Sequence, residues 1–455
     1  MNFKQAVNKH PQLKAVYEHL IIKTSMGRDY LFSTEFSSDV QWLKTQYRLT
    51  QECQEFIAHM KDNDKMLLEC VMYDIHNISG SLNMIENSQT LDDIALFEIK
   101  AFCLSCRQLN SMLCNLKSLE LIPQTFENVI DILDPEGLRT KQFYIYNAYH
   151  KDLEKMRNEF EKLKLEDSPA SAEIYNAILE TENAVRQRLC GELRPYVQEL
   201  KHAVMQIAIL DISIAKAELN MLLTLTKPDL NSSHTEYKQM FNPVIKEHLN
   251  KKGKNFQPID IKIGRQTMLI TGANMAGKTV ILKTLILNQL LAQFGFFTAC
   301  TAADICPVED ILFSIGDNQD ENQGLSSFAS EMLTLNDIVQ KVKTQKRYLV
   351  AADELARTTN PIEGVKLLNG FISVVNTGNS FCVVTTHYSN INADCIRMRV
   401  KGFINKNLTA PISIANLSEN IDYSLIEDNS DSVPVEALNL CRLLGIDKDW
   451  LFHCQ

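Results

Sequence analysis

The 455-residue sequence lacks a long apolar run that is free of charged residues. A transmembrane helix needs about 20 such residues, so we expect no segment that spans a membrane. An apolar signal peptide is also missing, because the chain opens with the polar stretch Met-Asn-Phe-Lys-Gln. Its twelve cysteines are scattered, which together with the missing signal predicts free thiols in a reducing cytoplasm.

An excess of positive charge is absent as well, since the formal net charge is -10 at pH 7. No global basic field therefore indicates a nucleic-acid partner, although net charge says nothing about a local basic patch. Cys103 and Cys106 form a lone Cys-x-x-Cys without a second pair at metal-binding spacing. This pattern weighs against a zinc or redox site.

Proline and glycine are scarce in the first half of the chain. Residues 41–120 contain no proline and only Gly80, and their apolar positions recur at intervals of three and four, which predicts helices. A longer helical tract is predicted at about residues 172–225, with an interruption near 191–195. Its charged and apolar residues alternate as in a coiled coil or lever arm. The alternative is an ordinary bundle helix with one solvated face.

The second half changes character after a polar, turn-rich stretch at residues 226–256. Beyond it, short apolar strands alternate with helical segments, a pattern typical of a parallel sheet covered by helices. The clearest of these strands are expected at residues 268–270, 348–352 and 381–385. We therefore predict an α+β multidomain protein, with an all-helical domain at residues 1–230 and an α/β domain at residues 231–455.

Residues 272–279 read Gly-Ala-Asn-Met-Ala-Gly-Lys-Thr, a complete Gly-x-x-x-x-Gly-Lys-Thr phosphate-binding loop. An apolar strand leads into the loop and a helical segment follows it, which is the context that this motif needs. Backbone N–H groups at such a helix start bind phosphate oxygens. Lys278 is expected to reach the β and γ phosphates, and Thr279 to ligate Mg²⁺. The predicted nucleoside triphosphate site consists of Gly272, Asn274, Met275, Ala276, Gly277, Lys278 and Thr279.

The strand at 348–352 ends in two acids, Asp353 and Glu354. Ligands of open parallel sheets lie beyond the carboxyl ends of the strands, so both acids are expected to reach the nucleotide. Asp353 is predicted to hold Mg²⁺ directly or through water, and Glu354 to polarise the attacking water. The alternative is a solvated turn after a strand.

Two further candidates follow from position in the chain. His387 comes after the strand at 381–385, where it is predicted to sense the γ-phosphate through a hydrogen bond; the alternative is a structural loop histidine. In the segment Gly-Leu-Ser-Ser-Phe-Ala-Ser-Glu-Met at 324–332, Ser326 or Ser327 is expected to cap a helix. The same geometry offers donors to a phosphate, so the two roles are compatible.

These four motifs together resemble the ATPase domain of the MutS family, a branch of the ABC-type ATPases. The family pattern Thr-Gly-x-Asn-Met-x-Gly-Lys is present at 271–278, and Gly-x-Ser-Thr-Phe-x-x-Glu-Met is present with Ser327 in place of threonine. The resemblance implies a helical core and lever followed by a P-loop domain that hydrolyses ATP with Mg²⁺. It also implies a homodimer in which Ser326 of one subunit faces the γ-phosphate held by the other, so that ATP opens and closes a clamp.

The resemblance is looser upstream, where Ser25-Met26-Gly27-Arg28 is similar to the start of the family's helical core and residues 211–217 to the helix end before the ATPase. Phe241 occupies the entry to the ATPase domain. It lies either beside the adenine or, as an ordinary core aromatic, away from it.

Departures from the family pattern also carry expectations. Mismatch-reading members have an N-terminal domain with a Phe-x-Glu wedge, and a second branch adds a C-terminal nuclease domain; we expect a short form without either. Arg357 stands where mismatch-repair members carry small residues, and our hypothesis is that it contacts the partner subunit or its nucleotide. The segment 360–364, Asn-Pro-Ile-Glu-Gly, is similar both to the second branch and to MutS-like proteins associated with adenosylcobalamin-dependent lysine aminomutases.

Two functions stay open at this point. The first is a dimeric clamp on mismatch-repair-related or branched DNA, without its own mismatch-reading domain, and it has the broader family precedent. The alternative is an ATP-dependent factor that remodels and reactivates an adenosylcobalamin-dependent aminomutase, for which no basic groove is needed.

Overall fold

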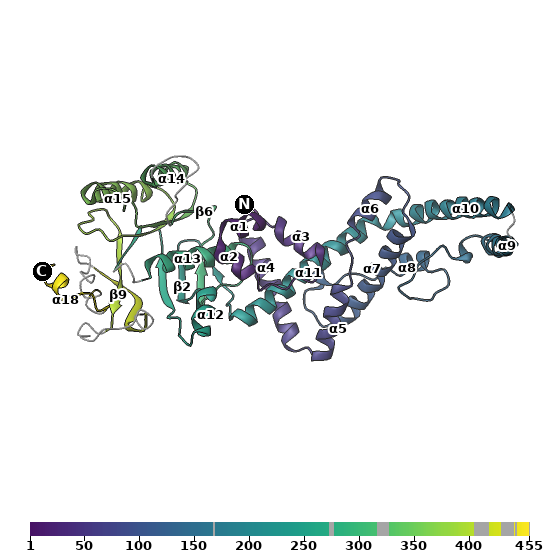
Figure 1. Cartoon of the computed structure of the whole chain (residues 1–455), viewed down its shortest axis with the longest axis horizontal. Coiled ribbons are helices and arrows are strands. Elements are labelled where there is room, and N and C mark those ends of the chain that lie inside the picture. Colours follow the sequence, from purple (N-terminus) through teal and green to yellow (C-terminus); the bar gives the residue numbers. More distant parts are fainter. Residues whose placement is uncertain are drawn as a thin grey trace. The chain divides into compact units, whose positions relative to one another are not determined.

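The computed structural model describes residues 1–166, 169–272, 277–315, 327–404, 418–428, 441 and 444–454. Contacts divide the chain into two compact units, which we call the helical unit and the sheet unit. The helical unit comprises residues 20–34 and 48–218. The sheet unit comprises Met1–His19, Glu35–Tyr47 and Leu219–Gln455. Figure 1 shows the elements of each.

The helical unit contains helices and connecting segments around one apolar core. Its helices are α3 (Ser25–Ser33), most of α4 (Val40–Ala58), α5 (Asp62–Tyr73), α6 (Ser79–Glu86), α7 (Asp93–Met112), α8 (Glu127–Leu133), α9 (Leu153–Leu165), α10 (Ala170–Leu193) and most of α11 (Val197–Leu223). The helices predicted for the first half are therefore confirmed. Among the described residues, none of these helices combines the length and apolar character that crossing a bilayer requires.

The long helical tract is α10 and α11, joined by a short 3-10 turn that contains Pro195. Helix α9 contacts α10, the helix that follows it in the chain. The buried residues of α10 lie mainly in its C-terminal half, where Val185, Leu189 and Leu193 join the core. The N-terminal half is largely solvated, so one helix combines core packing at one end with an exposed arm at the other.

The two segments that resemble the family's helical core meet in the structure. Asp211 of α11 accepts hydrogen bonds from the backbone N–H of Lys23 (3.1 Å) and Thr24 (2.7 Å) and from the Thr24 hydroxyl (2.7 Å). A Cβ atom at Gly27 would lie 2.5 Å from an Asp211 carboxylate oxygen. Glycine is therefore required where α3 starts against α11. Burial raises the pKa of Asp211, against the effect of these hydrogen bonds.

The larger sheet of the sheet unit has, in the described residues, the strand order β10-β9-β4-β8-β7-β6. Strands β9, β4, β8, β7 and β6 run parallel, and β10 is antiparallel to β9. The strands are β4 (Met268–Thr271), β6 (Asp310–Ser314), β7 (Tyr348–Asp353), β8 (Phe381–Thr385), β9 (Ile396–Phe403) and β10 (Ile421–Glu427). The three strands predicted from apolar runs are thus confirmed as β4, β7 and β8.

Helices cover both faces of this sheet, which explains why its central strands are continuous apolar runs. Helices α14 (Ser327–Val342) and α15 (Pro361–Val375) share a core with Val350 and Val384 on one face. Helix α13 (Lys278–Gln293) contacts β7 and β8, whose remaining residues Leu349, Ala351 and Val383 are fully buried. The α/β second half is therefore confirmed.

A second sheet was not predicted from the sequence. Within the described residues its order is β1-β5-β2-β3, with β1 (Asp229–Leu230), β2 (Thr235–Met240), β3 (Ile259–Ile263) and β5 (Ala302–Ile305). Strands β1 and β5 pair in parallel, whereas β2 is antiparallel to both β3 and β5. Its strands are short, and β1 and β2 lie in the stretch that reads as polar and turn-rich, so local apolar patterning did not reveal them. Helix α12 (Pro243–Lys251) connects β2 to β3.

The N-terminal residues belong to the sheet unit, so the division by contacts differs from the boundary that we predicted at residues 230 and 231. Helices α1 (Phe3–Lys9) and α2 (Pro11–Tyr17) lie in this unit. The ring of Phe3 is 5.1 Å from that of Phe294 and 5.6 Å from that of Phe296, just beyond the end of α13. The Tyr47 hydroxyl donates to the Ala292 carbonyl oxygen at 2.8 Å. Long-range aromatic packing thus joins the start of the chain to its second half.

Candidate nucleotide site

The phosphate-binding loop connects β4 to α13, as expected. Gly277, the residue before the helix, has φ 75°, a left-handed conformation that glycine adopts without strain. The Lys278 side chain is 3% exposed, and its Nζ donates to the Gly272 carbonyl oxygen at 2.7 Å. Lys278 therefore folds back over the start of the loop. The predicted contacts at Asn274, Met275 and Ala276 lie outside the described residues.

The two predicted Mg²⁺ ligands contact each other. The Thr279 hydroxyl, in the first turn of α13, donates to Asp353 Oδ2 at 2.6 Å. Asp353 is the last residue of β7, and its other carboxylate oxygen accepts a hydrogen bond from the Thr385 hydroxyl at the end of β8. A hydroxyl and a carboxylate oxygen are the hard donors that Mg²⁺ prefers, so this pair fits the ion.

Glu354 adopts a strained backbone conformation. Its φ of 49° lies in the left-handed region, which costs a residue other than glycine about 1–3 kcal/mol unless the surroundings hold it. Its N–H donates to the Thr385 hydroxyl at 3.1 Å. Its carboxylate lies 3.4 Å from Lys278 Nζ, and the side chain is 19% exposed. The conformation directs the carboxylate toward the phosphate-binding loop rather than along the strand.

Two further basic side chains flank Glu354 at longer range. His387 Nδ1 lies 4.0 Å from Glu354 Oε1, and Arg357 Nη1 lies 3.9 Å from Oε2. The side chains of His387 and Arg357 are 38% and 45% exposed. The structure therefore brings together Lys278, Asp353, Glu354 and His387, while Ser326 lies outside the described residues.

The loop after Glu354 is fastened from two sides, which the sequence interpretation missed. Ala356, with φ 60°, donates its N–H to Glu331 of α14 at 2.8 Å and accepts a hydrogen bond from the Tyr388 hydroxyl at 2.6 Å. A Cβ atom at Gly364 would lie 2.5 Å from that hydroxyl oxygen. Burial raises the pKa of Glu331. Glu331 belongs to the segment at 324–332 and Tyr388 follows His387, but nothing in the sequence showed that they meet at one loop.

A cavity of about 570 Å³ opens beside Gly277. Its lining is mainly apolar and includes Val280 and Ile281 of α13, Tyr423 of β10 and Phe256 from the segment before β3. A Cβ atom at Gly277 would come within 3.1 Å of the Tyr423 ring. These lining residues lie far apart in the sequence, so local sequence patterns did not predict the cavity.

Phe241 is not among the residues that line this cavity. It is 6% exposed, and Lys246 Nζ lies 4.3 Å from its ring centroid. It is therefore placed as a packed core aromatic, which was one of the two alternatives for this residue.

Comparison with known proteins assigns part of the chain. The family model MutS domain V matches residues 268–428. The chain is also similar to proteins named Endonuclease MutS2. One from Ligilactobacillus salivarius is 35% identical over 215 residues, covering 46% of this chain and 26% of the relative. One from Caldanaerobacter subterraneus subsp. tengcongensis is 33% identical over 221 residues, covering 47% and 27%.

A third such protein, from Bacillus cytotoxicus, is 36% identical over 191 residues, covering 41% of this chain and 23% of the relative. The matched part of the chain thus spans about a quarter of the length of each relative. These matches relate residues 268–428 to MutS domain V and part of the chain to proteins named Endonuclease MutS2.

Proposed function

We propose that this chain is a MutS-family ATPase that binds ATP with Mg²⁺ and hydrolyses it. The observation that carries the proposal is the meeting of four side chains at the carboxyl ends of β4 and β7. Thr279 lies 2.6 Å from Asp353, and Lys278 lies 3.4 Å from Glu354. The match of residues 268–428 to MutS domain V supports the same assignment.

Each side chain has a role that follows from its chemistry. Lys278 binds the β and γ phosphates, which then replace Glu354 as its anionic partner. Thr279 and Asp353 hold Mg²⁺, which neutralises phosphate charge when bound. Glu354 accepts a hydrogen bond from the attacking water and takes its proton. His387 donates to a γ-phosphate oxygen.

The nucleoside occupies the cavity beside Gly277. That cavity adjoins the phosphate-binding loop, and its mainly apolar lining suits a base and ribose. A Tyr423→Ala variant is expected to bind ATP about tenfold more weakly, because ring contact of this kind contributes about 1–3 kcal/mol. Unchanged ATP affinity in this variant would remove the cavity from the site.

The proposal extends to a homodimeric clamp on DNA. Similarity to relatives of the MutS2 type supports this extension. With a net charge of -10, contact with DNA phosphates requires a local basic surface. Titration with duplex and branched DNA at two salt concentrations tests it, because phosphate contacts make binding fall steeply with salt. Absence of binding at low salt would remove DNA as the target and leave the aminomutase alternative.

The ATPase assignment is tested by measuring ATP retention and phosphate release by the purified chain with Mg²⁺. We expect both activities in the wild type and neither in Lys278→Ala, because that variant loses the cation that binds the phosphates. A wild-type chain that neither retains nor hydrolyses ATP would overturn the proposal, whatever the DNA result.

A further inference from the structure

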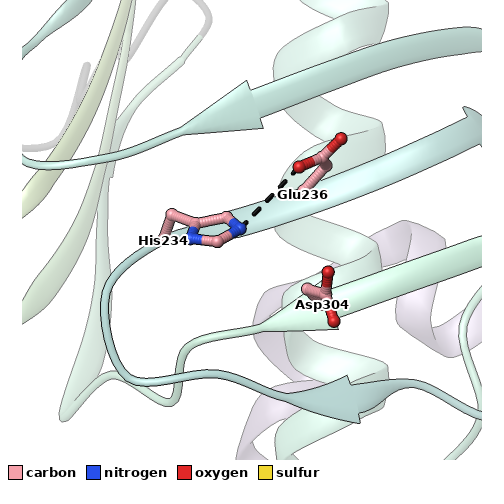
Figure 2. Close-up of side chains that lie close together, drawn as sticks. All are labelled: His234, Glu236 and Asp304. Atoms are coloured by element: carbon pink, nitrogen blue, oxygen red, sulfur yellow. Dashed lines mark ion pairs between the residues drawn. The ribbon is translucent and has the colours of Figure 1, made fainter.

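A second cluster of chemically reactive side chains lies on the β1-β5-β2-β3 sheet and plays no part in the proposed ATPase chemistry. His234 immediately precedes β2, Glu236 belongs to β2, and Asp304 belongs to β5. Glu236 and Asp304 stand directly opposite each other in the antiparallel register. One nitrogen or oxygen atom from each of the three residues lies within 4.8 Å of the others. Figure 2 shows the three side chains converging from two strands and the preceding loop.

The Ser233 hydroxyl links the His234 ring to the side chain of Asn231. Asn231 Oδ1 accepts from the Ser233 N–H at 2.8 Å and from the Ser233 hydroxyl at 3.0 Å. The Ser233 hydroxyl also lies 3.0 Å from His234 Nδ1. The other ring nitrogen, Nε2, lies 3.7 Å from Glu236 Oε2. A contact at one ring nitrogen orients a histidine so that its other nitrogen can bind a metal.

The two carboxylates of the cluster differ in their cationic partners. Glu236 is paired with Lys238 at 2.8 Å and with Lys262 at 3.0 Å. In the part of the chain that the structure describes, the Asp304 carboxylate makes neither a hydrogen bond nor an ion pair. Like charges directly opposite each other on antiparallel strands are destabilising. A divalent cation between Glu236 and Asp304 removes that repulsion.

We propose that His234, Glu236 and Asp304 bind a divalent transition-metal ion, with Zn²⁺ the ion that one imidazole nitrogen and two carboxylate oxygens fit best. Ligands around tetrahedral Zn²⁺ lie roughly 3.3–3.6 Å from one another, given bond lengths of about 2.0–2.2 Å. The His234–Glu236 separation of 3.7 Å is already close to that spacing. The widest of the three separations, at most 4.8 Å, closes with a shift of about 1 Å, well within side-chain rotation.

The lysines that hold Glu236 do not prevent this. Their side chains are 54% and 60% exposed, and exposed ion pairs contribute only about 0–1 kcal/mol. Bound metal ties the loop at residues 231–234 to strands β2 and β5. The site therefore stabilises the smaller sheet, and a water molecule completes the coordination of the metal.

Calorimetric titration of the nucleotide-free chain with Zn²⁺ tests the site. His234→Ala and Asp304→Asn are compared with the wild type and with His248→Ala, which removes an exposed histidine of α12 from the same unit. We expect the wild type and His248→Ala to bind one equivalent of Zn²⁺. The other two variants are expected to bind it at least tenfold more weakly. The twelve cysteines are common to all four proteins, so zinc bound to thiols cancels in the comparison. Equal zinc binding by all four proteins would overturn the proposal.

Two further measurements sharpen the test. Zn²⁺ is expected to raise the unfolding temperature of the wild type more than that of Asp304→Asn, since ligands stabilise the state that binds them. Replacing Lys238 and Lys262 by glutamine removes the competing cations and is expected to tighten zinc binding several-fold. Unchanged affinity in this double variant would show that the ion does not take Glu236, and would overturn the ligand set.

Discussion

At the scale of single residues, the most informative feature is the conformation of Glu354. A left-handed φ at a residue other than glycine persists only where neighbouring groups hold it. Here the Thr385 hydroxyl accepts the Glu354 N–H and donates to Asp353, so one side chain positions both acids. Both acids were predicted from their place after a strand. The sequence did not indicate the backbone geometry that directs Asp353 to Thr279 and Glu354 to Lys278.

The first prediction concerns the chemistry of that carboxylate. Glu354→Gln keeps the shape of the side chain but removes its capacity to take a proton. We expect ATP affinity to stay within about twofold of the wild type while turnover falls at least ~100-fold, the range for loss of a general base. Equilibrium binding of ATP and phosphate release measured on the same preparation provide the check. Unaltered turnover would exclude Glu354 as the base.

At the scale of elements, the loop after β7 connects the site to α14 and to the end of β8. Its residue Ala356 is bonded to Glu331 on one side and to Tyr388 on the other, at 2.8 and 2.6 Å. Glu331 lies one turn from the start of α14, the helix predicted to carry the phosphate-facing serine at its N-terminus. We therefore expect a shift of α14 to move Ala356, and with it the loop that begins at Glu354.

Removing the Tyr388 hydroxyl tests this connection. Tyr388→Phe leaves the ring in place and loses a buried hydrogen bond worth about 1 kcal/mol. We expect turnover to fall several-fold while ATP affinity is retained. The Tyr388 hydroxyl donates to Ala356, and not to Lys278 or Thr279, which are proposed to bind the phosphates and Mg²⁺. Tyr348→Phe, at the opposite end of β7, is the control. Equal effects of the two variants on turnover would mean that the hydroxyl does not position Glu354.

A second element-scale prediction concerns the joint between α1 and α2. His10 is buried there, with its ring 5.2 Å from that of Phe313. Burial lowers the pKa of His10 from 6.5 to about 4, with a smaller lowering by Lys9 and an opposing effect of Asp310. The unfolded chain therefore takes up this proton first as pH falls. Stability present above pH 6.5 is lost as pH falls toward 4.

Replacing His10 isolates that contribution. At about 1.4 kcal/mol per pKa unit, the loss amounts to at most ~3.5 kcal/mol. We expect the unfolding free energy of His10→Gln to decline less steeply than that of the wild type between pH 6.5 and 4. Denaturant unfolding at several pH values measures the difference. Parallel curves for the two proteins would show that His10 does not contribute to acid sensitivity.

The sequence predicted the features that depend on local patterning. It did not predict those that depend on contacts between residues far apart in the chain. Strands β4, β7 and β8 are apolar runs with motif residues at their ends, so local patterning located them and the acids beside them. The smaller sheet, the cavity beside Gly277 and the attachment of α1 depend on residues far apart in the chain. Rings such as Phe3 and Phe294 carry no local mark of their pairing.

At the scale of the whole molecule, two side chains of the candidate site are exposed in the part of the chain that the structure describes. Arg357 and His387, on either side of Glu354, are 45% and 38% exposed. Hydrolytic sites work best when bulk water is excluded and charges act at low dielectric. A second copy of the chain that contributes Ser326 across the nucleotide would exclude water from these side chains, as the resemblance to MutS ATPases implies.

Subunit mixing tests this arrangement with a gain of activity rather than a loss. Lys278→Ala and Ser326→Ala are each expected to be nearly inactive as homodimers, because every composite site in them lacks one essential group. In a mixed dimer with two-fold symmetry, one site carries both defects and the other carries neither. Random exchange makes half of the dimers mixed, so the mixture should regain roughly a quarter of wild-type phosphate release. An inactive mixture whose subunits demonstrably exchange, or a fully active Ser326→Ala protein, would show that each nucleotide is hydrolysed within a single chain.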